Sequence, residues 1–108
     1  MNTVSEQRWH TFTLAEQLAN IGSEVGRAAK WQDKDKKLFD GAVKRAIELI
    51  DLTLEDTRWR SRLLELGYFK EFFCDAVLGG HEYGTTFASL ERYLLPFMKV
   101  TARAYSII

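Results

Sequence analysis

The sequence predicts an all-helical domain, folded as an antiparallel four-helix bundle with up-down-up-down topology. Three observations lead to this prediction. The chain of 108 residues contains one proline, long stretches repeat apolar residues at the 3.6-residue period of an α-helix, and the connections between those stretches are short, as between antiparallel neighbours in a bundle. A chain of this length fits one domain, residues 1–108, of which residues 1–12 are expected to form an N-terminal arm.

The first long helix is predicted over residues 14–31. Thr13 and Glu16 have the spacing of a capping box, in which two side chains satisfy the first free backbone amides. Its apolar stripe contains Leu14, Leu18, Ile21 and Val25. Gly22 and Gly26 lie in a stripe of small residues beside it, where each glycine costs about 1 kcal/mol relative to alanine. We interpret them as a place where a neighbouring helix approaches closely; a surface kept for a ligand or partner is the alternative.

The second and third helices are predicted over residues 36–55 and 57–78. Asp56 is the expected N-cap of the third helix, because an aspartate side chain accepts hydrogen bonds from the free amides there. Almost no loop remains between the two helices, so a tight antiparallel hairpin is expected. The residues of the third helix predicted to be buried are Trp59, Leu63, Leu66, Phe69 or Phe73, and Val77.

The stretch GGHEYGTT, residues 79–86, is expected to connect the third helix to the fourth. Gly79 occupies the position of a left-handed C-terminal cap, and Thr85 or Thr86 should cap the next helix. Pro96 lies inside that helix and should kink or break it, because proline has no amide hydrogen to donate. The apolar face of the fourth helix is predicted to contain Phe87, Leu90, Tyr93, Leu94, Phe97 and Thr101. In a bundle, this connection and the polar connection at 32–35 lie at the same end.

Composition favours a cytoplasmic protein without a membrane segment. Fifteen basic residues balance fifteen acidic ones, which argues against a general binder of nucleic acid or anionic membranes, although a local basic patch remains possible. The N-terminal residues lack the apolar segment of a signal peptide, and no run approaches the roughly 18 apolar residues of a membrane span. Cys74 is the one cysteine, and we expect it to be a buried, inert thiol.

The sequence predicts no catalytic residue, metal site or cofactor. A di-metal site in a bundle needs Glu-x-x-His pairs, and neither His10 nor His81 lies three residues after a glutamate. Phosphate-binding loops, dinucleotide fingerprints and nucleophile turns are also missing from the sequence. An enzyme is therefore the less favoured class. The alternative is a site built around His81, Glu82 and Tyr83, which must otherwise be explained as parts of a turn.

Two sets of residues are candidate polar sites. Arg58, Trp59, Arg60 and Arg62 join phosphate-binding side chains to an aromatic ring that can stack, which suggests an anion or nucleic-acid contact. In a bundle, Arg8, Trp9, His10, Arg103 and Tyr105 would lie at the same end; a solvated surface is the alternative. Glu24 and Arg27 on the first helix are candidate partners for Glu71 and Asp75 on the third, in a buried polar network that fixes helix alignment.

The leading functional hypothesis is an interaction module that associates with itself or with a protein partner. Tyr68, Phe69, Phe72 and Phe73 spread around more of the third helix than one core contact requires, so part of this surface is expected to face a partner. The first alternative is an accessory protein that binds RNA or DNA through the basic end. The second, which the resemblance described next implies, is a HEPN-like enzyme or toxin–antitoxin component.

The chain resembles small helical bundles of the HEPN-like class, many of which act on RNA or belong to toxin–antitoxin pairs. The stretches TLAEQLANIGSEVGRA, AIELIDLTLEDTRW and GGHEYGTT are similar to small prokaryotic proteins, over nearly the whole chain. The HEPN ribonuclease motif is an arginine followed by four to six residues and a histidine. Neither His10 nor His81 follows an arginine at that spacing, so the resemblance implies a member without this catalytic motif.

Overall fold

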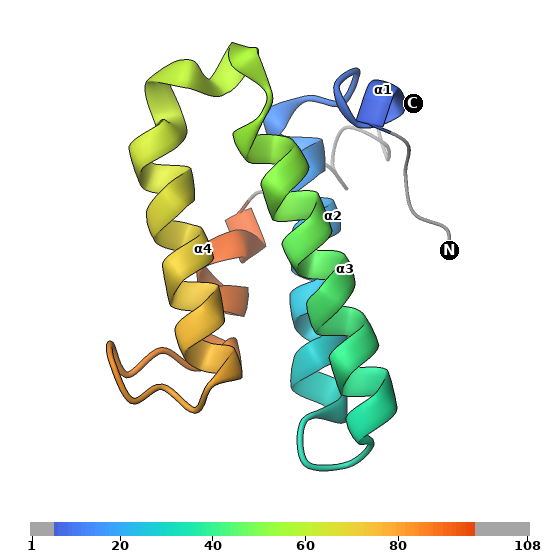
Figure 1. Ribbon diagram of the computed structural model, residues 1–108, viewed down its shortest axis with the longest axis vertical. Helices are drawn as coiled ribbons and strands as arrows, with labels where there is room; N and C mark the ends of the chain where they lie inside the picture. The colour runs from blue at the N-terminus through green and yellow to red at the C-terminus, as the bar shows by residue number, and fades with distance from the viewer. Residues whose placement is uncertain (1–5, 97–108) are drawn as a thin grey trace.

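The computed structural model describes residues 6–96, and these residues form helices joined by short connections (Figure 1). The elements are α1 (Glu6–Trp9), α2 (Leu14–Trp31), α3 (Lys36–Leu54), the 3₁₀ helix η1 (Thr57–Arg62), α4 (Leu63–Val77) and a last helix, 87–96. No strand occurs within this part of the chain. The prediction of an all-helical domain is therefore confirmed.

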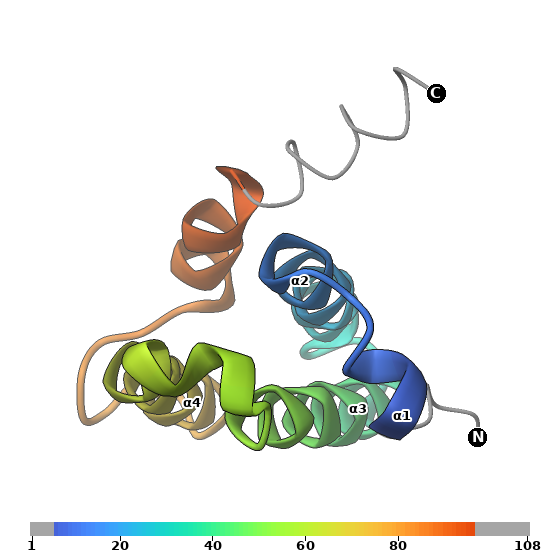
Figure 2. The same ribbon diagram turned by 90° about the horizontal axis from the view of Figure 1, so that it is seen from above.

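The long helices form two layers. Seen from above, α3 and α4 lie in one layer, and α2 and helix 87–96 lie in the other (Figure 2). The connections at 32–35 and 79–86 both lie at the lower end of the molecule in Figure 1, as expected from the sequence. The η1 segment joins α3 to α4 at the opposite end. Any site at an end of the molecule must therefore draw on one of these two sets of connections.

Apolar side chains from all four long helices fill the space between the layers. The buried apolar residues are Trp9, Leu18, Ile21, Val25, Ala28, Ala42, Ala46, Leu49, Ile50, Leu66, Phe69, Phe73, Ala76, Phe87, Leu90 and Leu94. Most lie on the helix faces that the 3.6-residue pattern identifies. Trp9 is the main exception, because it comes from the region expected to be an N-terminal arm. Residues 6–9 instead form α1, and Trp9 is 0% exposed, with its indole Nε1 donating to Thr53 Oγ1 at 3.1 Å.

The starts of α2 and α3 are fixed by side-chain caps. The predicted capping box is present: Glu16 N donates to Thr13 Oγ1 at 3.1 Å, and Thr13 N donates to Glu16 Oε1 at 2.8 Å. Asp35 caps α3 by accepting from Leu38 N at 3.0 Å. Each cap satisfies a backbone amide that has no partner inside its own helix.

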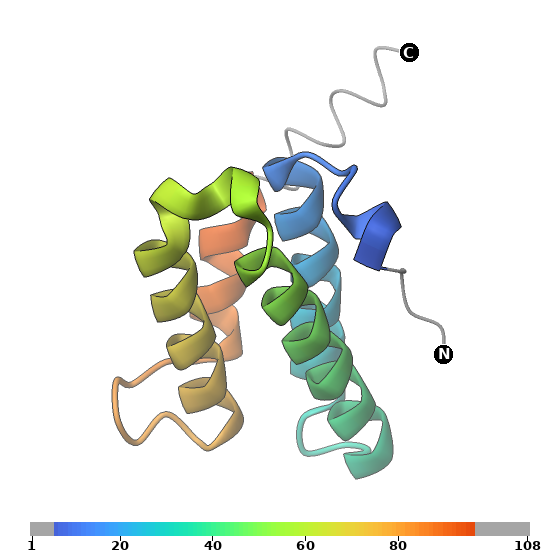
Figure 3. The ribbon, with the colours of Figure 1, turned by 45° about the horizontal axis from the view of Figure 1, so that its top comes forward.

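The expectation of one continuous third helix over residues 57–78 is wrong. The segment begins as η1, with Trp59 at φ −102° and ψ 24°, and becomes α-helical only at Leu63. Asp56 does cap it as predicted, accepting from Arg58 N at 3.1 Å. Because η1 crosses from the end of α3 to the start of α4 (Figure 3), no tight hairpin forms. The break also changes which side chains face inward, so Leu63 is exposed rather than buried.

Toward the end of α4, the buried residues agree with those predicted from the apolar pattern of the sequence. Phe69 and Phe73 are both buried, and Val77 packs partly buried against the core. Gly79 adopts a left-handed conformation, φ 102°, at the position predicted for the C-terminal cap. Thr86, and not Thr85, caps helix 87–96 by accepting from Ser89 N at 3.1 Å.

Gly26 of α2 was predicted to lie where a neighbouring helix approaches closely. A Cβ atom added at Gly26 would lie 3.5 Å from the Glu91 carboxylate, an ordinary contact with a side chain. Within residues 6–96, no close backbone approach explains Gly26. The fourth helix was predicted to continue past Pro96 with a kink, and to carry Phe97 and Thr101 on its apolar face. This part of the chain lies outside the described residues.

Candidate functional site

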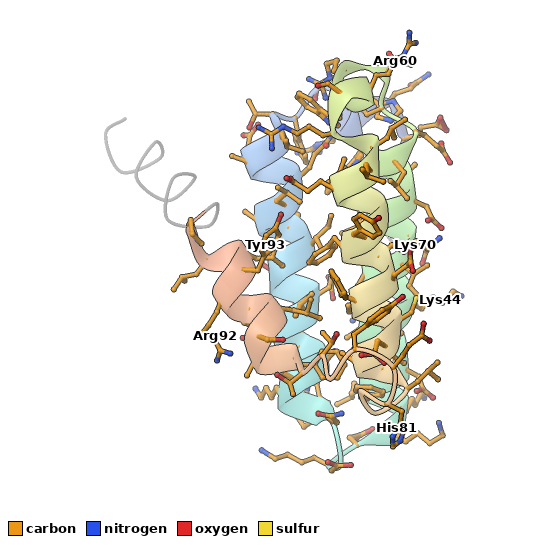
Figure 4. All side chains as sticks on the ribbon, turned by 90° about the vertical axis from the view of Figure 1, so that its left-hand side faces the viewer. Lys44, Arg60, Lys70, His81, Arg92 and Tyr93 are labelled. Carbon is orange, nitrogen blue, oxygen red and sulfur yellow. The ribbon has the colours of Figure 1, made fainter. Side chains whose placement is uncertain are left out.

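The candidate binding residues lie at two opposite ends of the molecule. Arg60 is at the upper end and His81 at the lower end of the view in Figure 4. The arginine-rich segment and the GGHEYGTT segment therefore do not form one site. Between these ends, a groove runs along α4.

At the upper end, Arg58 is bound to the protein itself. Its guanidinium contacts the buried carboxylate of Asp56, with Nη2 2.6 Å from Oδ2, and donates from Nη2 to the Phe12 carbonyl at 2.7 Å. It also lies 4.5 Å from the centre of the Trp59 ring. The hydrogen bond from Arg58 lowers the pKa of Asp56 well below its usual range, against the opposing effect of burial. These contacts favour the structural interpretation of Arg58 over a nucleic-acid contact.

Gln17 is the centre of this end, and the sequence analysis missed it. The side chain is 0% exposed. Its Nε2 donates to the Trp9 carbonyl at 2.9 Å and to Asp56 Oδ2 at 3.2 Å, while its Oε1 accepts from Trp59 Nε1 at 2.8 Å. One signal was available: Gln17 lies on the apolar face of its helix, three residues after Leu14. A buried amide must find partners inside the protein, so its position predicted a polar contact of this kind.

The remaining residues of the upper end are arranged differently from the prediction. Arg60 and Arg62 are exposed, and Arg62 pairs with Glu65 at 3.4 Å. Trp9 is buried, so its proposed place in an accessible basic and aromatic surface is wrong. His10 lies with Nε2 3.2 Å from the Leu52 carbonyl. Arg8 is exposed, and Arg103 and Tyr105 lie outside the described residues.

The candidate polar network is divided into two separate groups. Glu24 is buried and accepts from Arg27 of its own helix at 2.8 Å and from Arg45 of α3 at 3.2 Å. Glu71 and Asp75 instead contact the connection at 79–86. Glu24 therefore links α2 to α3 through Arg45, and the predicted link from Glu24 and Arg27 to Glu71 and Asp75 is wrong.

Asp75 organises the connection at residues 79–86. Its carboxylate accepts hydrogen bonds from the backbone amides of Glu82 at 2.9 Å, Tyr83 at 3.1 Å and Thr85 at 3.0 Å. Burial alone would raise the pKa of Asp75, but these amide donors outweigh it and lower the pKa. Gly80 allows the tight path, because at its φ of 76° an added Cβ would lie only 2.8 Å from the Thr85 carbonyl oxygen. One carboxylate thus fixes the shape of the whole connection.

The groove lies between α4, the connection at 79–86 and helix 87–96. Its volume is about 740 Å³, and it is lined by Ser61, Leu64, Glu65, Tyr68, Phe69, Phe72, Tyr83, Gly84, Thr85, Ser89, Leu90 and Tyr93. The lining is mostly apolar and aromatic, with Phe69 stacked on Tyr93 at 5.9 Å and Phe72 edge-on to Tyr83 at 5.1 Å between ring centres. Figure 4 shows Tyr93 between helix 87–96 and α4.

A tyrosine and a glutamate meet at each end of the groove. At one end, the Tyr83 hydroxyl donates to Glu71 Oε1 at 3.1 Å, and the carboxylates of Glu82 and Glu71 raise the pKa of Tyr83 to about 12. At the other end, burial and the carboxylate of Glu65, which accepts from its hydroxyl, raise the pKa of Tyr93. The groove is therefore apolar along its length and negatively charged near both ends.

The other predicted chemistry finds little support in the geometry. His81 and Glu82 are exposed and do not line the groove. Cys74 is half-buried rather than fully buried. Within residues 6–96, no three His, Cys, Asp or Glu side chains gather as possible ligands of a metal ion. None of the helices in this range combines the length and apolarity needed to cross a membrane.

Comparison of the chain with models of protein families, with curated proteins and with solved structures found no match. The resemblance to HEPN-like bundles therefore stays a prediction.

Proposed function

We propose that this chain is a non-enzymatic helical module that associates with a second copy of itself through the groove. Its proposed framework is an antiparallel four-helix bundle of α2, α3, α4 and helix 87–96, with the groove on the outer side of the last two helices. The supporting observation is the apolar surface beside the groove, where Leu64 is 72% exposed and Tyr68 is 51% exposed.

Exposed apolar residues of α4 form a stripe along the helix. Leu64, Tyr68 and Phe72 recur every four residues, so they lie on one face of the helix. Burying a large apolar side chain contributes about 1.5–3 kcal/mol, and aromatic residues are enriched in the centres of protein interfaces. This stripe is therefore a surface that gains stability when another chain covers it.

The shape and charge of the surface suit a second copy. A two-fold dimer uses the same patch on both subunits, so the patch must be complementary to itself. Here an exposed ridge, Leu64 and Tyr68, lies directly beside a hollow of about 740 Å³. The chain has no net charge, so two copies do not repel each other over long range.

Light scattering during size-exclusion chromatography tests the proposal. We expect the parent chain to be a dimer at high micromolar concentration and Tyr68→Glu to be a monomer, because the substitution places a charge in the apolar contact. Leu38→Glu is the matched control, since Leu38 is 45% exposed on α3 and does not line the groove. A parent chain that stays monomeric, or a Tyr68→Glu variant that dimerises like the parent, contradicts the proposal.

A further inference from the structure

The charges around the groove are unbalanced. Among the residues that line it, Glu65 carries the only full charge, and Glu71 and Glu82 lie beside Tyr83 at the other end. Two described cations of this side are directed elsewhere: Lys70 pairs with Asp51 of α3 at 2.6 Å, and Arg92 points away from α4 in Figure 4. Arg62 pairs with Glu65 only across 3.4 Å, with both side chains half exposed. An occupant with apolar and basic side chains therefore complements the groove.

The groove is also long and narrow. The wall formed by η1 and α4 runs from Ser61 to Phe72, a length of about 17 Å measured along the two helix axes. The opposite wall is formed by residues between Tyr83 and Tyr93. Two such walls suit a single extended or helical segment, as in recognition of a helix by an apolar groove.

The chain contains a segment with this chemistry. Residues 97–108, FMKVTARAYSII, include Lys99 and Arg103, many apolar residues and no aspartate or glutamate. A helix of this length is about 18 Å long, which is close to the length of the groove. Glu65 and Glu71 are about 9 Å apart along α4, and Lys99 and Arg103 would be about 6 Å apart along a helix, a difference that long basic side chains can span.

We infer that the groove of one copy receives residues 97–108 of a second copy, with Lys99 and Arg103 directed toward Glu65 and Glu71. The inference rests on the proposed self-association and specifies the two surfaces that meet in the dimer. A second copy is favoured over the same chain, because Tyr93 already forms part of the groove wall and Pro96 follows three residues later. The same chain would have to reverse direction at once, and such a connection consumes about 2–8 residues. When each copy places its residues 97–108 in the groove of the other, the two contacts are equivalent and the dimer has two-fold symmetry.

A mixing experiment tests the inference with two variants of the full chain. Tyr68→Glu disables the groove and leaves residues 97–108 intact. Lys99→Glu combined with Arg103→Glu disables the segment and leaves the groove intact. We expect each variant alone to dimerise at least about tenfold more weakly than the parent in sedimentation velocity, because attractive charges become repulsive or the apolar contact is lost. A one-to-one mixture should regain dimers, since it contains one intact groove and one intact segment.

A charge exchange within one chain gives an independent measurement. Glu65→Lys with Glu71→Lys should weaken the dimer, and adding the reversal of Lys99 and Arg103 should restore it. Far-UV circular dichroism of each variant checks that it is folded.

The outcomes separate this inference from the proposed function. If Tyr68→Glu abolishes the dimer while reversal of Lys99 and Arg103 leaves it unchanged, self-association stands and residues 97–108 are not the occupant. A mixture that remains as monomeric as its components also overturns the inference. A parent chain that is monomeric overturns both.

Discussion

Two buried aspartates organise the two ends of this molecule, and they do so in different ways. Asp56, at the upper end, binds the guanidinium of Arg58 and the amide of Gln17. Asp75, at the lower end, binds backbone amides of residues that follow it within the next ten positions. The first therefore joins segments far apart in the sequence, and the second shapes one local connection.

The difference indicates what each end does. The Asp56 end is closed: Gln17, Trp9 and Trp59 satisfy one another inside the protein, and their contacts hold α1, α2 and η1 together. The Asp75 end supports the wall of an open groove, because the connection that it fixes carries Tyr83. We therefore expect changes at the first end to lower stability, and changes at the second to act mainly on association.

The largest expected effect is that of Gln17→Leu. The substitution leaves Trp59 Nε1 and the Trp9 carbonyl without their buried partner, and we expect a loss of about 3 kcal/mol in the free energy of unfolding. Urea denaturation followed by circular dichroism measures this loss. Gln7→Leu is the control, since Gln7 is exposed on α1, and it should change stability by less than about 0.5 kcal/mol. Equal effects of the two substitutions would contradict a central role for Gln17.

The next effect is that of Asp75→Ala on association. Three backbone amides lose their acceptor, so the connection at 79–86 no longer holds Tyr83 against Phe72. We expect the dimer to dissociate about tenfold more readily, while the cooperative unfolding transition is retained. Sedimentation velocity and denaturation of the same sample measure the two properties. If the variant dimerises like the parent, the connection does not support the groove.

Acid titration sharpens the comparison between the two aspartates. The pKa of each is lower in the folded protein than the ordinary value of 3.8. Their contribution to stability is therefore complete above about pH 4 and is lost as the pH falls further, through the folded-state pKa. Arg58→Ala should remove the main cause of the shift at Asp56 and flatten this acid dependence, with a loss of about 1–2 kcal/mol at neutral pH.

Arg60→Ala is the matched control for that titration, since Arg60 is exposed in the same segment. It should retain the acid dependence of the parent. The residual acid dependence of Arg58→Ala then reports Asp75 together with the bonds that Asp56 retains from Gln17 and from the backbone amide of residue 58. An Arg58→Ala variant whose stability falls with acid as steeply as that of the parent would show that the guanidinium does not hold the Asp56 charge.

The smallest expected effect concerns Tyr83. The carboxylates of Glu82 and Glu71 raise the pKa of its hydroxyl to about 12. Replacing both glutamates with glutamine should lower this pKa toward 10, as followed by ultraviolet absorbance during alkaline titration. Tyr83→Phe identifies the titration step that belongs to this residue. An unchanged titration curve would mean that the groove end is less negative than described.

Local signals in the sequence predicted most of the fold. Capping chemistry identified Thr13, Glu16 and Asp56 correctly, and the glycine requirement of a left-handed cap identified Gly79. Such signals depend on residues a few positions apart, so they can be recognised without knowledge of the tertiary structure. The same kind of argument predicted that part of the aromatic surface of this helix is exposed, because one core contact cannot use every face of a helix; the exposed residues are Tyr68 and Phe72.

The features that were missed depend on distant partners. The position of Gln17 on the apolar face of its helix indicates burial, but its partner Trp59 lies 42 positions away, and no periodicity of the helix identifies that partner. Arg58 and Trp59 of η1 bond to the Phe12 carbonyl and to Gln17, which are more than 40 positions away. The groove likewise requires the spacing between α4 and helix 87–96, which tertiary packing sets.

The central claim is that the groove beside α4 is the surface through which two copies associate. Sedimentation equilibrium over a concentration series, performed in parallel on the parent, Tyr68→Glu and Leu38→Glu, tests it most directly. We predict that the parent and Leu38→Glu fit a monomer–dimer equilibrium with the same Kd, while Tyr68→Glu stays monomeric at every concentration. The account is contradicted if all three chains are monomers, or if Tyr68→Glu dimerises with the Kd of the parent.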